Sequence, residues 1–159
     1  MEHRVKVLVC QKFKRNTELQ LAARLYRLHK LQKAILVGAR DINFGDSEVE
    51  GMRWIWEMSK NNGRVVYVEN ENGYPVAMCV VEAINQRQDR YLVHGLYVAH
   101  DSRRRGMAKA MLAVIEYIQG SHELNVFGNN LPKPARALFE SFNYQPGGNG
   151  GVLWSQRQS

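Results

Sequence analysis

The sequence predicts a mixed α/β fold, in which helices flank a central, mostly antiparallel sheet. Along the chain the residue patterns follow the order strand, two helices, three strands, helix, strand, helix, strand. Three successive strands favour antiparallel pairing, and the strand–helix units that follow supply helices to cover the sheet. The chain has 159 residues, of which 45% are hydrophobic and 23% charged, which indicates a single globular domain over residues 1–159.

The first part of the chain predicts one strand and two helices. Residues 4–10 alternate basic and apolar side chains and predict a strand. After a basic loop, Thr17 is expected to cap a helix that runs to about residue 36. Its apolar stripe repeats at three- and four-residue spacing and consists of Leu21, Leu25, Leu28, Leu31 and Ile35. Ser47 is expected to cap a second helix through residue 60, which packs through Trp54, Ile55 and Met58.

The middle of the chain predicts three strands, over residues 64–69, 75–84 and 89–99. Asn72-Gly73 lies between the first two and supplies the positive φ that a hairpin turn needs. The second strand is apolar at nearly every position, so we expect both of its faces to be covered.

The last part of the chain predicts helix, strand, helix and strand. A helix is expected over residues 106–119 and a short strand over 123–127. A second helix over 134–142 is expected to end at Asn143 in the left-handed conformation. A glycine-rich loop over 146–151 then leads into a closing strand, residues 152–157.

Several classes of protein are excluded by composition. No apolar run approaches the ~20 residues needed to span a bilayer, and the amino terminus does not resemble a secretory signal. Cys10 and Cys79 sit in apolar runs without neighbouring cysteine or histidine ligands. We therefore expect buried free thiols, no metal site and a cytoplasmic location.

The net charge of +7 is concentrated at the amino-terminal end of the chain. Residues 1–40 carry ten Lys/Arg and two Glu, whereas the remainder is close to neutral. This asymmetry fits either an anionic partner or a solvated helix face. A nucleic-acid contact through Lys12, Lys14, Arg15, Arg24, Arg27 and Lys30 would depend on charge alone, because no aromatic side chains are interleaved there to stack on bases.

The stretch from Leu96 to Ile118 carries the strongest chemical signal. An apolar strand enters a polar loop, three arginines follow, and Gly106 and Ala108 open a helix. The first turn of a helix exposes unpaired N–H groups and the positive end of the helix dipole, which together bind phosphate oxygens. Walker and dinucleotide-binding glycine motifs are both absent, and the glycines near residue 150 precede a strand.

These residues resemble a known family. Arg103-Arg104-Arg105-Gly106-Met107-Ala108 matches the [Q/R]-x-x-G-x-[G/A] signature of GNAT-type N-acetyltransferases, and Leu96-Tyr97-Val98 resembles the strand end before it. The segment from Asn130 to Tyr144 resembles their second motif. The order of elements also agrees with the GNAT fold over roughly residues 4–157.

The resemblance implies acetyl-CoA as the cofactor. Its pyrophosphate would lie on the loop and helix start, and its pantetheine arm on the strand end. The strand over 123–127 would splay away to admit the thioester. The implied cofactor-binding residues are Leu96, Tyr97, Val98, Arg103, Arg104, Arg105, Gly106, Met107, Ala108, Lys109, Asn130 and Phe139.

Two residues are candidates for the catalytic base. His94 is the first, because it lies just before the strand end, where the resemblance implies an acid or base, and because imidazole titrates near neutral pH. Its alternative role is a hydrogen bond within the sheet. Glu82 on the preceding strand is the second, and its alternative is a strand-end carboxylate facing solvent. Because Phe139 replaces the tyrosine frequent in the family, the donor of a proton to the thiolate is left between Tyr144, Tyr97 and water.

The predicted function is acetyl-CoA-dependent N-acetylation of a primary amine: a small molecule, a lysine side chain or a protein N-terminus. The resemblance implies that the segment joining the first two helices lines the acceptor site. Here it carries Asp41, Asp46, Glu48 and Glu50, which would either suit a cationic acceptor or form a solvated acidic loop. Trp54 and Trp56 are expected either in the acceptor pocket or in the core. The alternative is a weak or inactive GNAT-fold binding module that uses the basic amino-terminal helix on an anionic partner. A homodimer is a further expectation, and a membrane partner is not expected.

Overall fold

The computed structural model describes residues 4–10, 16–31, 48–99, 106–120, 122–128, 131, 133–147 and 153–156. These residues form one seven-stranded sheet, in the order β1-β2-β3-β4-β5-β7-β6, and four helices. The strands are β1 (Arg4–Val9), β2 (Arg64–Glu69), β3 (Pro75–Ala83), β4 (Arg90–Val98), β5 (Glu123–Phe127), β6 (Tyr144–Pro146) and β7 (Leu153–Gln156). The helices are α1 (Asn16–Leu31), α2 (Glu48–Ser59), α3 (Met107–Gln119) and α4 (Lys133–Ser141).

The predicted fold class is confirmed. All neighbouring strands in the sheet pair antiparallel except β4 and β5, which are parallel. Strand β3 is buried at every residue except Val76, as its continuous apolar sequence predicts. Both of its faces are covered by helices, and this removes the polar alternation that a solvent-facing strand would need.

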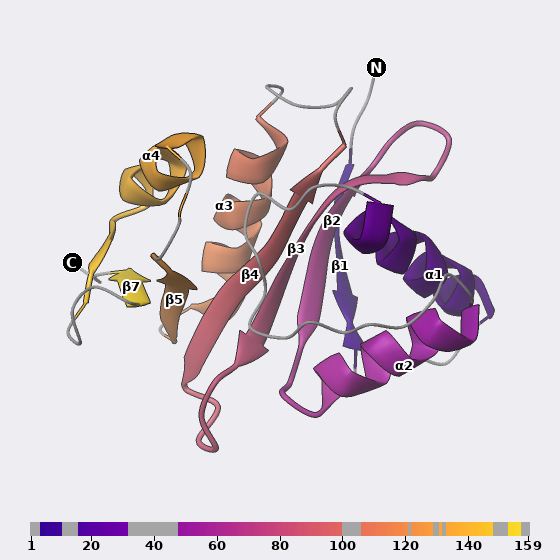
Figure 1. The fold of residues 1–159 in the computed structure, drawn as a ribbon, viewed down its shortest axis with the longest axis horizontal. Helices are drawn as coiled ribbons and strands as arrows, with labels where there is room; N and C mark the ends of the chain where they lie inside the picture. The colour runs from indigo at the N-terminus through magenta and orange to yellow at the C-terminus, as the bar shows by residue number, and fades with distance from the viewer. Residues whose placement is uncertain are drawn as a thin grey trace.

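The helices divide between the two faces of the sheet, with α1 and α2 on one side and α3 on the other (Figure 1). On the first face the core joins Leu25, Tyr26 and Trp54 to Met78 and Val80 of β3. On the second face α3 packs on the odd-numbered residues of β3, and Phe139 of α4 joins the same cluster. Each face of β3 and β4 therefore lies against a different set of helices.

The helix predictions hold with small changes. Helix α1 begins at Asn16, one residue before the expected cap Thr17, while Ile35 and Ser47 lie outside the described residues. The buried face of α1 includes Ala22 and Tyr26, which the predicted leucine stripe omitted. The ring centroids of Tyr26 and Trp54 lie 6.3 Å apart, so part of this buried face is the contact of α1 with α2.

Strand β6 was missed by the sequence analysis, which assigned its end to a glycine-rich loop. It has only three residues, and its sequence Tyr-Gln-Pro carries no repeating pattern. It forms because Asn143 adopts φ 67°, as predicted, and turns the chain so that Tyr144 pairs with Gln156 of β7. Pairing with a strand distant in sequence creates β6, so local propensity could not identify it.

Among the described residues, no helix is long and apolar enough to cross a membrane.

Candidate active site

The central feature of the site is a divergence of two parallel strands. β4 pairs with β5 at only three positions, Arg90 with Glu123, Tyr91 with Leu124 and Leu92 with Asn125. β4 then continues to Val98 on its β3 side without further pairing to β5 in the described part of the chain. In Figure 1, β5 and β7 lie to one side of β4, below α4. The two strands thus form a wedge with its apex at Leu92.

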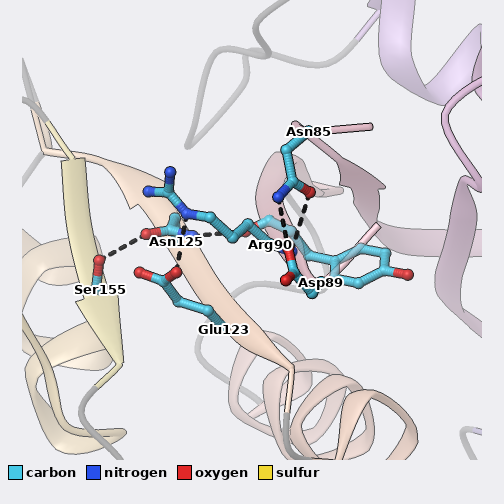
Figure 2. Close-up of polar contacts among 7 residues, drawn as sticks. Asn85, Asp89, Arg90, Glu123, Asn125 and Ser155 are labelled. Carbon is cyan, nitrogen blue, oxygen red and sulfur yellow. Dashed lines mark hydrogen bonds and ion pairs between the residues drawn. The ribbon is translucent and has the colours of Figure 1, made fainter. Parts of the chain in front are cut away.

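Side chains hold the apex of this wedge closed (Figure 2). Arg90 Nε lies 2.8 Å from Glu123 Oε2 across the strand pair. The fully buried Asn125 donates from Nδ2 to the Tyr91 carbonyl at 3.2 Å and accepts from Ser155 Oγ at 2.6 Å. Asn125 therefore connects β4, β5 and β7 at the last paired position, so the divergence starts from a fixed point.

A bulge in β4 sets the direction of the side chains beyond the apex. The β3 partners shift between Met78–Tyr97 and Val80–His94, which leaves β4 one residue longer than β3. Gly95 occupies the bulge with φ 58°, a left-handed conformation that glycine adopts without steric cost. Leu96 and Val98 consequently face the α3 side, while Tyr97 faces the α1–α2 side.

Helix α3, the next element after β4, has an open amino-terminal end. Gly106 is the N-cap of α3, with φ 74°, and its carbonyl accepts from the Ala110 amide at 3.0 Å. Within the described part of the chain, no side chain caps the first turn, and a Cβ placed on Gly106 would meet no atom within 4 Å. Met107 is buried and Lys109 exposed, so the backbone of this turn is accessible on its polar side. The predicted Arg103, Arg104, Arg105 and Asn130 lie outside the described residues.

His94 and Glu82 form a buried pair next to the bulge. Nε2 of His94 lies 2.7 Å from Oε1 of Glu82, although the contact is not aligned as a regular hydrogen bond. The side chains are 7% and 3% exposed. The proposed role of Glu82 as a solvent-facing strand-end carboxylate is therefore wrong, because Asn61 Nδ2 and His94 enclose its two oxygens.

The second ring nitrogen of His94, Nδ1, is buried and has no hydrogen-bond partner in the described part of the chain. A neutral imidazole carries one N–H and one lone pair. The Glu82 carboxylate beside Nε2 favours the proton on that nitrogen, which leaves the lone pair on Nδ1. A buried, unpaired lone pair is the state that a general base requires before it accepts a proton.

The two cysteines do not supply a nucleophile. Both are free and buried, as predicted. Burial raises the pKa of Cys10 to about 12, with the Glu82 charge as a smaller cause, and burial also raises the pKa of Cys79 to about 12. Since the thiolate is the reactive form, both side chains are inert near neutral pH. No group of potential metal ligands occurs among the described residues.

Phe139, the replacement for the usual tyrosine, is fully buried in α4. Its ring contacts Tyr144 of β6 edge to face, with 5.0 Å between ring centroids. Burial raises the pKa of the Tyr144 phenol above its ordinary range, which keeps the hydroxyl protonated but makes it a weaker acid than an exposed phenol. The phenol ring of Tyr144 is thus in contact with Phe139, which occupies the position where the family often carries a tyrosine.

The predicted acceptor and partner residues are only partly placed. Trp54 is 2% exposed and belongs to the core, whereas Trp56 is 59% exposed with Lys60 Nζ over its ring. In the basic amino-terminal region, Lys6 pairs with Glu69 at 2.7 Å and Arg24 stacks on Tyr74 at 4.4 Å. Asp41, Asp46, Lys12, Lys14 and Arg15 lie outside the described residues, and the side chain of Lys30 is likewise not described.

Three residues of this site escaped the sequence analysis: Gly95, Asn61 and Asn125. A glycine inside a strand pattern is a signal for a bulge, so Gly95 was detectable. Asn125 is the polar residue in the otherwise apolar centre of β5, which suggests a buried hydrogen bond. Asn61 follows the end of α2 in a turn and carries no local signal, because its partner Glu82 is 21 residues away.

Comparison with known proteins agrees with this geometry. Residues 61–146 match the sequence profile of the acetyltransferase (GNAT) domain. No significant match was found among curated proteins.

Solved structures share the fold. The PaiA N-acetyltransferase of Thermoplasma acidophilum in complex with coenzyme A is 10% identical, with a TM-score of 0.59 over 99% of this chain and 100% of the other. A phosphinothricin acetyltransferase of Sinorhizobium meliloti in complex with AcCoA is 16% identical, with a TM-score of 0.64 over 98% of this chain and 85% of the other. A ribosomal-protein-alanine N-acetyltransferase of Brucella melitensis is 15% identical, with a TM-score of 0.58 over 88% and 89% of the two chains.

The bulge requires a glycine at position 95, and this requirement can be tested by substitution. A Cβ at this position would lie 3.1 Å from Val80 Cγ2, in addition to the strain of positive φ. Gly73 is the matched control, because its φ is 79° and a Cβ there would meet nothing within 4 Å. We expect Gly73→Ala to lower the free energy of unfolding in urea by about 1–2 kcal/mol, and Gly95→Ala to lower it further. Equal losses would mean that the bulge is not tightly packed on β3.

Proposed function

We propose that this chain is an acetyl-CoA-dependent N-acetyltransferase acting on a primary amine. The proposal starts from the family, because the chain belongs to the GNAT acetyltransferase domain family. The observation that carries this proposal is the wedge between β4 and β5. It opens beyond Leu92 on the same end of β4 that leads to the open start of α3. A long thioester with an anionic end fits such a combination of slot and helix terminus.

The cofactor would use three parts of the site. The pyrophosphate would accept hydrogen bonds from the first-turn amides of α3, where Gly106 leaves room and the helix dipole favours negative charge. The pantetheine arm would lie along the β5-facing edge of β4 from Leu96 to Val98. Two proteins of the same fold were solved with coenzyme A or AcCoA, which supports this choice of cofactor.

The reaction would be direct transfer to the amine, because neither cysteine is a thiolate near neutral pH. The amine nitrogen attacks the thioester carbonyl carbon, the C–N bond forms and the C–S bond breaks. Backbone amides of β4 near the bulge would stabilise the developing oxyanion. His94 Nδ1 would take the amine proton, and the departing thiolate would gain a proton from Tyr144, Tyr97 or water.

The acceptor would be a small amine, a lysine side chain or a protein N-terminus. The protein would act in the cytoplasm, where buried free thiols such as Cys10 and Cys79 are common. The direct test is release of free coenzyme A from acetyl-CoA with a panel of these three amine classes. We expect one class to give turnover well above hydrolysis. Hydrolysis-level rates with every amine, together with tight coenzyme A binding, would instead favour a binding module.

Gly106 tests the cofactor site. Gly106→Glu places a carboxylate where the pyrophosphate would lie, and we expect coenzyme A affinity measured by calorimetry to fall by at least about tenfold, or roughly 1.4 kcal/mol. Gly106→Ala is the control, since it shares the strain of φ 74° without adding charge or bulk. We expect it to bind more tightly than the glutamate variant. Unchanged affinity in Gly106→Glu would place the pyrophosphate elsewhere.

His94 tests the chemistry. We expect His94→Ala to lower kcat by about 10²-fold or more while coenzyme A affinity stays near wild type, because the base acts on the amine. His122→Ala is the matched control, since His122 is an exposed histidine whose Nδ1 contacts the Gln119 carbonyl at 2.9 Å. A His94 variant with the wild-type rate and pH profile would make His94 a structural residue.

A further inference from the structure

One proton transfer of the proposed reaction has no assigned residue, the one that neutralises the departing thiolate. Phe139 is fully buried, and its phenyl ring has no proton to give. Tyr144 belongs to the cluster on the α3 face of the sheet, and burial raises the pKa of its phenol above the ordinary range. Even an unperturbed phenol is a weaker acid than a thiol by roughly 1.5 pKa units, so its proton moves uphill to a thiolate. A stronger acid than either tyrosine named above would serve the sulfur better.

His94 lies on β4 just beyond the apex of the wedge. It follows Leu92, the last β4 residue paired with β5, and its side chain is on the same face of the sheet as its β3 partner Val80. Nε2 is directed to Glu82 of β3 at 2.7 Å. Nδ1 is buried and has no hydrogen-bond partner within the described residues. Nδ1 is therefore the ring nitrogen left to meet a ligand at the unpaired edge of β4.

The groups around Glu82 keep its carboxylate fixed against Nε2. Oε2 accepts from Asn61 Nδ2 at 3.1 Å, while Oε1 faces His94. Two further titratable groups lie near Glu82: Lys60 after α2, which lines an open pocket with it, and Cys10 after β1, whose raised pKa keeps the thiol protonated. A carboxylate held in this way stabilises an imidazolium without removing its Nε2 proton, as the carboxylate of a serine-protease triad does. Only Nδ1 then gains and loses a proton.

We propose that His94 Nδ1 is a fourth candidate donor and the one that acts: it takes a proton from the acceptor amine and gives the same proton to the sulfur of coenzyme A. This inference rests on the proposed function. The amine nitrogen and the sulfur are bonded to one carbon during the transfer, so a group within hydrogen-bond distance of the first lies close to the second.

The protons and electrons of this sequence balance. Nδ1 gains the amine proton as the C–N bond forms. When the C–S bond breaks, its electron pair goes to the sulfur, and Nδ1 returns the proton there. A free imidazolium is a stronger acid than a thiol by about two pKa units, so the return is downhill. His94 ends neutral with its proton on Nε2, as it began, and the reaction needs no tyrosine at Phe139.

The thiol of bound coenzyme A reports the contact with Nδ1 without any acceptor amine. The measurement is the ultraviolet absorbance of the thiolate in a pH titration of the enzyme–coenzyme A complex. The test variant is His94→Gln, which keeps an amide N–H for Glu82 but has no group that titrates. The matched control is His122→Gln, because His122 is an exposed histidine outside the site. Calorimetry with coenzyme A shows that each variant still binds the cofactor.

An imidazolium beside the sulfur stabilises the thiolate, so the thiol pKa of bound coenzyme A should be lower when His94 is present. We expect the thiolate to appear at least about one pH unit lower in wild type and His122→Gln than in His94→Gln, a tenfold change in the acid constant. A second readout uses the wild type alone. The ¹⁵N NMR signal of His94 Nδ1 should move on binding coenzyme A but not on binding desulfo-coenzyme A, which lacks the sulfur.

Two results would overturn this double role of His94. They are the same thiol pKa in wild type and His94→Gln, and the same response of Nδ1 to coenzyme A and to its desulfo analogue. Either result leaves wild-type turnover intact, and His94 can still act as the base for the amine, so the proposed function stands. A wild type that binds no coenzyme A, or that turns over no amine class, is a separate outcome, which contradicts the proposed function and this inference together.

Discussion

The short parallel pairing of β4 with β5 is the constraint on which the remaining site depends. Asn125 fixes the last paired position by bonding Tyr91 and Ser155, and the Arg90–Glu123 ion pair adds a second connection beside it. Because Asn125 is fully buried, loss of its partners would leave polar groups unpaired at a cost of about 1–3 kcal/mol. The apex is therefore stable while β4 beyond it has one edge that no described strand covers, and a ligand can be bound there without breaking the sheet.

The bulge and the buried pair follow from the same strand. Gly95 adds one residue to β4 and so turns Tyr97 to the α1–α2 side and Leu96 to the α3 side. The His94–Glu82 pair lies just before this change, under the helices of the first face. Removing a carboxylate and an imidazole from water is costly, and a buried ion pair of this kind seldom adds stability over apolar residues of the same volume. The proposed role of His94 as the base would account for such a pair beside the edge of β4 that β5 leaves unpaired.

Much of the fold was predictable because its elements have strong local patterns. The apolar run of β3, the helical spacing of α3 and the left-handed Asn143 each depend on residues close together in sequence. The candidate site was predictable in a different way. Gly106 and the residues that follow it were predicted from the chemistry of a helix start, and His94 from the resemblance, which implies an acid or base just before this strand end. Strand β6 and the contact of Asn61 with Glu82 were not predictable, since both depend on partners far along the chain.

The sequence by itself determined the mixed α/β class, the order of most elements, the burial of both cysteines and the open start of α3, because each follows from local pattern, composition or glycine chemistry. Only the tertiary structure decided that β4 and β5 separate after Leu92, and that Glu82 is buried between His94 and Asn61 and not solvent-facing. The reason is physical: strand divergence and the burial of a charge are set by which segments meet across the sheet. The spacing of residues along one strand does not show which distant segments will pack against it.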